Sequence, residues 1–107
     1  MNIASTLKAL NAYPIPSPLI ENIIEGEGLD GEQEATADIR QSKEYKRAKA
    51  KVFRFLSTAP NISQQGISYS FTNEDKAYFR RCASQIMDEI GEGDEEEMQY
   101  GYIGDNF

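Results

Sequence analysis

The chain has 107 residues, with no histidine, no tryptophan and a single cysteine. Without histidine it lacks the most frequent general base and the most frequent side-chain ligand for transition metals. One cysteine cannot form a disulfide within the chain, which is typical of a protein from a reducing compartment. These absences argue against an enzyme, and we expect no cofactor and no bound metal.

Long apolar runs are missing as well. No stretch approaches the roughly 18 apolar residues that a membrane-spanning helix requires. The first ten residues contain one lysine and no apolar run of about seven residues, so they do not have the pattern of a signal peptide. We therefore expect a soluble protein that is made in the cytoplasm and has no membrane partner.

Positive and negative charges are separated along the chain, whose net charge is -7. Seven of its eleven lysines and arginines lie between Arg40 and Arg54, whereas residues 88–107 hold eight of the eighteen acids and no base. An acidic protein as a whole repels nucleic acid and anionic membranes. The separation favours a protein that docks onto copies of itself or onto a larger assembly.

The spacing of apolar residues predicts a mainly α fold. We expect a small helical bundle of about four helices, with a short β-hairpin between the last two and a C-terminal tail. The expected helices before the hairpin are residues 2–12, residues 17 to about 25, and one long helix over residues 38–59. Ser17 should cap the second helix, because Pro18 suits a first helical position, and Thr36 or Asp38 should cap the third.

Residues 61–71 change to a two-residue repeat. Ile67, Tyr69 and Phe71 alternate with serines, as in a half-buried strand, and Gly66 suits the turn of a hairpin. An isolated two-stranded hairpin is marginally stable in water. It should therefore pack on the helices or pair with another chain.

A last helix should follow the hairpin and end at Gly91. Thr72 and Asp75 have the spacing of a capping box at its start, and Cys82 falls on its apolar face. We interpret Cys82 as a core residue rather than a nucleophile. The chain thus divides into a helical domain, residues 1–91, and an acidic aromatic tail, residues 92–107.

Five basic residues form a stripe along one face of the predicted helix 38–59, beside its apolar face. They are Arg40, Lys43, Arg47, Lys51 and Arg54. Such a row can follow a nucleic-acid backbone, but it can equally be a solvated face or dock on an acidic partner, such as the tail of another copy. The last two interpretations are favoured, because the chain is acidic and no aromatic residue interleaves the stripe for base stacking.

The tail combines acids with apolar side chains. Acidic composition alone is typical of disorder, and consecutive acids point in different directions, so they do not form a calcium loop. The apolar residues of the tail look like anchors for a partner. They are Tyr100, Tyr102, Ile103 and Phe107.

The segment 59–71 resembles the head–tail connector proteins of tailed bacteriophages, also called adaptor or head-completion proteins. Members of that family show a helix, a short helix, a long helix, a hairpin with the pattern P-x-x-S-x-x-G-x-S-x-S, and a further helix. Here the pattern begins at Pro60 and ends at Ser70. Residues 7–10, 13–14 and 28–30 are also similar to some members. The resemblance spans about residues 7–91 and excludes the tail.

The resemblance implies a structural protein of the virion, assembled in the cytoplasm of the bacterial host. Such a protein forms a homo-oligomeric ring on the portal, extends the DNA channel and offers a platform for the tail. Its expected partners are portal and tail proteins, and it could contact DNA in the channel non-specifically. Residues 63–71 are the one segment whose role carries over, as a contact with a neighbouring subunit or ring.

Two other functions stay open. The first is a small regulatory module that binds nucleic acid or a host protein through the basic stripe. The second is an acidic decoy or inhibitor that acts through the tail.

Overall fold

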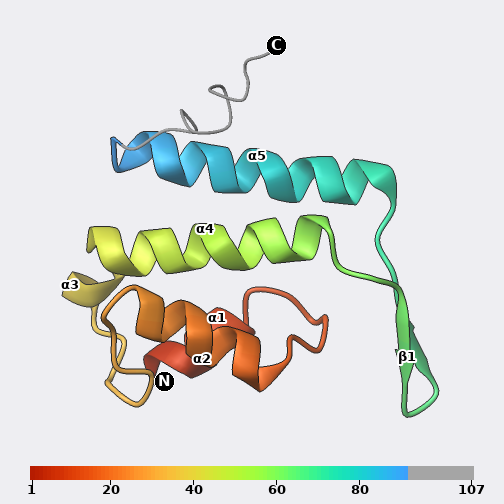
Figure 1. The fold of residues 1–107 in the computed structure, drawn as a ribbon, viewed down its shortest axis with the longest axis horizontal. Coiled ribbons are helices and arrows are strands. Elements are labelled where there is room, and N and C mark those ends of the chain that lie inside the picture. The colour runs from red at the N-terminus through yellow and green to blue at the C-terminus, as the bar shows by residue number, and fades with distance from the viewer. Residues whose placement is uncertain (92–107) are drawn as a thin grey trace.

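The computed structural model describes residues 1–91 (Figure 1). In chain order the elements are α1 (Ile3–Lys8), α2 (Ser17–Gly26), α3 (Ala37–Arg40), α4 (Lys43–Ser57), β1 (Ile62–Gln64), β2 (Ile67–Tyr69) and α5 (Asn73–Glu89). The predicted class, mainly α with a β-hairpin between the last two long helices, is confirmed.

Helix α4 is the central element of the bundle. Figure 1 shows α5 running antiparallel to α4 on one side, and α1 and α2 lying on the other. Among the described residues, α5 packs on no helix except α4. The molecule is a flat body of 41 × 37 × 19 Å. Its radius of gyration of 14.9 Å exceeds the roughly 13 Å of a compact domain of this size.

The main core lies between α4 and the N-terminal helices. Its largest fully buried side chains are Ile3, Leu7, Ile20, Val52 and Leu56, each of which stabilises the fold by about 1.5–3 kcal/mol relative to exposure. The predicted apolar face of α4 is therefore the core face. A second, smaller cluster joins α4 to α5 and consists of Ala50, Ala83, Met87 and Ile90.

The prediction of one long helix over residues 38–59 is wrong, because Ser42 divides it. The Ser42 hydroxyl donates to the carbonyl of Ile39 at 2.6 Å, at the end of α3, and accepts from the Tyr45 N–H at 3.2 Å, at the start of α4. One serine thus satisfies a backbone group of each helix, which favours a break over a continuous turn.

Two other helix boundaries differ from the predictions. Helix α1 is shorter than residues 2–12, and the chain turns after it where the Asn11 side chain accepts from the Tyr13 N–H at 2.9 Å. Ser17 does not cap α2: it is the first helical residue and follows Pro16. Its hydroxyl accepts from the Lys8 ammonium at 2.8 Å instead.

The caps predicted at Thr36 and Thr72 are present, although Thr36 caps only the short α3 and Ser42 caps α4. Thr36 caps α3 by accepting from the Ile39 N–H. Thr72 and Asp75 form the predicted capping box at the start of α5, with both hydrogen bonds at 3.0 Å. These caps were predictable because their partners lie three residues apart in the sequence.

The hairpin is short and tight. Its antiparallel register pairs Ile62 with Tyr69 and Gln64 with Ile67. The two turn residues, Gln65 and Gly66, have φ of 52° and 81°, and positive φ at both central positions is what a type I′ turn requires. Each strand has three residues, so Phe71 lies beyond β2 rather than inside the predicted strand.

Candidate interaction surfaces

Two members of the basic stripe are engaged inside the fold. Arg47 Nε lies 2.7 Å from Glu27 Oε1, and Lys51 Nζ lies 2.6 Å from Glu27 Oε2. The Glu27 side chain is only 6% exposed. Glu27 occupies the C-cap position of α2, where the negative end of the helix dipole disfavours a carboxylate. The two cations offset this cost and fasten α4 to the end of α2.

The environment of Glu27 also shifts its acidity. Burial raises the pKa of its carboxyl, but hydrogen bonds and positive charge from Lys51 and Arg47 outweigh burial and hold the pKa below its ordinary value of 4.5. Glu27 is therefore a carboxylate at neutral pH. Arg47 and Lys51 have a structural role that the helical wheel alone could not show.

The other three stripe residues lie in different settings. Arg40 is on α3 and exposed, and Lys43 is exposed at the first residue of α4. Arg54 lines a hollow between α4 and α5 together with Arg80. The structure therefore does not bring the five residues together as one open basic face.

A second group of cations gathers at the other end of the bundle. Arg40, Lys46 and Lys49 line a hollow of about 530 Å³, together with residues of α1, α5 and the N-terminus. Lys46 pairs with Glu89 of α5 at 3.1 Å. We call this hollow the basic hollow. Lys46 and Lys49 do not belong to the basic stripe, and only the folded chain brings them to the same hollow as Arg40.

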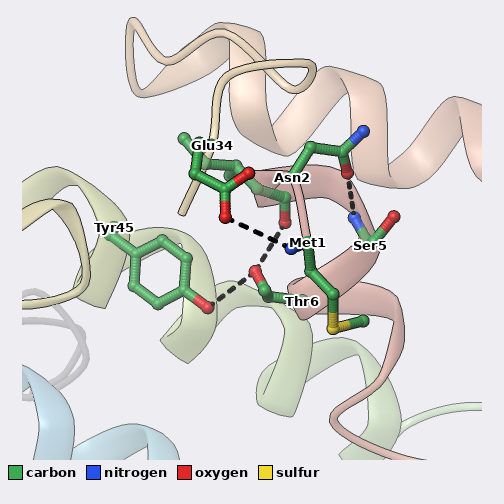
Figure 2. Close-up of polar contacts among 7 residues, drawn as sticks. Met1, Asn2, Ser5, Thr6, Glu34 and Tyr45 are labelled. Carbon is green, nitrogen blue, oxygen red and sulfur yellow. Dashed lines mark hydrogen bonds and ion pairs between the residues drawn. The ribbon is translucent and has the colours of Figure 1, made fainter. Parts of the chain in front are cut away.

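The wall of the basic hollow is held in place by polar contacts from the N-terminus (Figure 2). The Tyr45 hydroxyl donates to the Thr6 hydroxyl at 2.9 Å, and the Thr6 hydroxyl donates to the Ile3 carbonyl at 2.8 Å. The Met1 ammonium pairs with Glu34 at 3.3 Å. These contacts tie α1 to α4 and to the segment before α3, so the lining residues are positioned by the fold.

The hairpin is fixed to the body at its base. Tyr13, in the segment between α1 and α2, stacks on Phe71 at 5.4 Å between ring centroids and meets the edges of Phe55 and Tyr69 at 6.1 and 6.3 Å. Its hydroxyl donates to the carbonyl of Pro60 at 2.6 Å. Of the three predicted hairpin residues, Tyr69 and Phe71 thus pack on the body.

The tip of the hairpin stands away from the helices. Figure 1 shows it projecting at one end of the flat body, across the direction of α4 and α5. In the described part of the chain, the backbone of neither strand lies close to a helix. Ile67, the third predicted residue, is 54% exposed. The alternating pattern therefore marks the hairpin correctly, but its first apolar residue is not part of the core.

Two residues with central roles were missed by sequence analysis. In the sequence, Tyr13 stands out only as part of the similar segment 13–14, and Glu27 does not stand out at all. Their partners lie far along the chain, so no local spacing shows them. A lone aromatic in a turn and a lone acid at a helix end are the available signals, and both are weak.

The four predicted tail anchors, Tyr100, Tyr102, Ile103 and Phe107, lie outside the described residues. Within residues 1–91, no group of three or more acids or cysteines is arranged to hold a metal ion. Cys82 is half-buried on α5, and its hydrogen bond and charge raise the pKa of the neighbouring Tyr78. No helix among the described residues is long and apolar enough to cross a membrane.

Comparison with known families places the chain in one of them. Residues 1–100 match the profile of a protein family of unknown function (DUF6706). The chain belongs to this family. The match covers the whole helical body, the hairpin and the acidic run of residues 94–97. No curated protein and no solved structure matches the chain.

Proposed function

We propose that this DUF6706 chain is a structural protein of a phage virion, the subunit of a head–tail connector. Copies of it would form a ring on the portal that extends the DNA channel and carries the tail. The observation that carries the proposal is the hairpin, which is fixed at its base and exposed at its tip. The resemblance of residues 60–70 to the connector hairpin pattern points the same way.

A projecting hairpin with an anchored base is suited to bind a neighbouring subunit. Because Tyr13 and Phe71 hold its base, little conformational freedom is lost when the tip binds, and such preorganisation favours association. The strands are also short and open at their outer edges, where another chain can add by backbone hydrogen bonding. A hairpin on one copy that contacts the body of the next is a heterologous contact, and repetition of such a contact gives a ring when its rotation closes.

The nucleic-acid-binding alternative has less support. It relied on five cations along one helix face, and Arg47 and Lys51 are paired with the buried Glu27. Arg40 belongs to a different helix. Non-specific contact with channel DNA would fall to the exposed cations, such as Lys43, and it remains part of the connector proposal rather than a separate function.

The test compares two single substitutions at adjacent hairpin positions. Ile67→Asp places a charge on the exposed apolar tip residue, and Ser68→Asp places the same charge on the opposite face of β2. The phage gene would be complemented with each variant, and purified particles would be analysed by mass spectrometry. We expect the wild-type chain and Ser68→Asp in particles at a fixed ratio to the portal, and Ile67→Asp to be lost from them.

Folding of both variants is checked by thermal unfolding of the isolated chain, which should change little because neither side chain is in the core. Absence of the wild-type chain from purified virions would overturn the proposal. Equal incorporation of Ile67→Asp and wild type would show that the hairpin tip is not part of the contact between subunits.

A further inference from the structure

The basic hollow carries an excess of positive charge on an otherwise acidic protein. Three cationic side chains line it, from Arg40, Lys46 and Lys49, against one carboxylate, Glu89. Lys46 is paired with Glu89. Within residues 1–91, no hydrogen bond or ion pair engages the Arg40 or Lys49 side chain. Cations that line one hollow repel each other, and an anionic group bound there would relieve that repulsion.

An anionic segment of the same chain begins within reach of this hollow. Helix α5 ends beside it, since both Ile86 and Glu89 are among the lining residues. Residues 94–97 are four consecutive acids. Four residues lie between Glu89 and Asp94, and the five residue steps that join them span at most about 17 Å when extended.

We propose that the basic hollow binds the acidic run of residues 94–97 of its own chain. The carboxylates would lie against Arg40 and Lys49, and the segment would fold back from the end of α5 across α3 and α4. Its own chain is the expected source because a short covalent connection gives an effective concentration in the millimolar range, which a second copy does not reach in dilute solution. This contact does not depend on ring assembly.

The experiment uses the full-length chain with one spin label in the tail. The native cysteine is removed by Cys82→Ala and a label site is introduced by Gln99→Cys. Paramagnetic broadening of backbone amides is then measured in ¹⁵N spectra at low ionic strength, about 0.01 M, where the Debye length is ~30 Å. We expect selective loss of signal around Arg40, Lys46 and Lys49. The loss should disappear near 1 M salt, where the Debye length is ~3 Å.

Two pairs of charge reversals identify the surface. Arg40→Glu with Lys49→Glu should restore the amide signals, whereas Lys43→Glu with Lys76→Glu should leave the broadening unchanged. The control pair reverses the same number of charges near helix N-termini, which tolerate acids, and neither residue lines the hollow. Unshifted amide positions elsewhere show that each variant remains folded.

Isotopic mixing separates the chain's own tail from that of another copy. In the first sample, ¹⁵N protein that carries the spin label is diluted with protein that has neither label. In the second sample, ¹⁵N protein without a spin label is mixed with spin-labelled protein that contains no ¹⁵N. Broadening in the first sample alone supports the proposal. Broadening in the second sample shows that the tail docks on another copy and overturns it. Absence of broadening at low salt, or broadening that survives Arg40→Glu with Lys49→Glu, overturns it as well.

Discussion

Glu27 shows how a single side chain sets the role of its neighbours. A carboxylate that is 6% exposed at the C-terminal end of a helix would be unfavourable alone. Arg47 and Lys51 offset the unfavourable free energy of this carboxylate, because they supply two charged hydrogen-bond donors from adjacent turns of α4. The same carboxylate partly neutralises both cations, which weakens their attraction for a nucleic acid or an acidic partner.

Glu27→Gln should destabilise the protein by about 1–2 kcal/mol. The expected loss is smaller than the ~3–5 kcal/mol of a fully buried broken pair, because the cationic partners are partly exposed. Urea unfolding monitored by circular dichroism measures it. Glu25→Gln, an exposed change on the same helix, should have little effect. Equal losses in the two variants would contradict the structural role of Glu27.

The contribution of Glu27 should also depend on pH in a defined direction. Its folded-state pKa lies below the ordinary 4.5, so the unfolded chain binds its proton first as the pH falls. The stabilisation is complete above pH 4.5 and is lost as the pH falls through the lower, folded value. The difference in unfolding free energy between wild type and Glu27→Gln should therefore be constant near neutral pH and shrink in acid. A difference that grows in acid would show a raised pKa instead.

Among the elements, the β1–β2 hairpin combines a fixed base with an imperfect turn. Gln65 has a φ of 52°, a left-handed conformation that costs a residue with a β-carbon roughly 1–2 kcal/mol. Gly66 adopts its positive φ without this cost. The turn therefore retains strain at one of its two positions.

Gln65→Asn should strengthen the hairpin by up to about 1 kcal/mol, because Asn-Gly is the preferred pair for a type I′ turn and asparagine tolerates positive φ. Hydrogen exchange of the β1 and β2 amides measures the gain as slower exchange. Gln64→Asn, inside β1, is the matched control and should not slow exchange, because asparagine is disfavoured in strands. Unchanged exchange in Gln65→Asn would show that the turn is not strained.

The elements also show which parts of the fold local sequence can predict. The capping box of α5 and the turn at Gly66 were predictable, because all their partners lie within a few residues. The break at Ser42 was not, because the apolar spacing continues across it and a serine in a helix pattern is common. The five residues of the basic stripe do not form one open surface, for a different reason. Glu27, which pairs with Arg47, lies 20 residues from it in sequence, and no periodicity reveals a partner at that distance.

At the scale of the whole molecule, α5 is the least integrated long helix. Among the described residues it packs on no helix except α4, and its C-terminal half does so through the small cluster of Ala50, Ala83, Met87 and Ile90. Its N-terminal end is held more firmly, since Phe79 contacts Phe71 at 4.8 Å and Phe53 at 6.2 Å between ring centroids. The stability of α5 should therefore decrease along its length.

Native-state hydrogen exchange tests this gradient. Amides of residues 83–89 should exchange through a partial opening of lower free energy than amides of residues 48–56 in α4, whose side chains form the main core. Met87→Ala should lower the opening free energy of the first group by about 2 kcal/mol or more, as for other buried methionines. A single opening free energy for both helices would show that α5 unfolds only with the rest.

The aromatic contacts of Tyr13 connect the position of the hairpin to a part of the chain that is distant in sequence. The ring belongs to the segment between α1 and α2, yet it touches the residues that set where β1 and β2 leave the body. Pro14 and Pro16 on its C-terminal side limit the backbone of that segment. We therefore expect that a shift of α1 and α2 against α4 would displace Tyr13 and, through these contacts, reorient the hairpin tip.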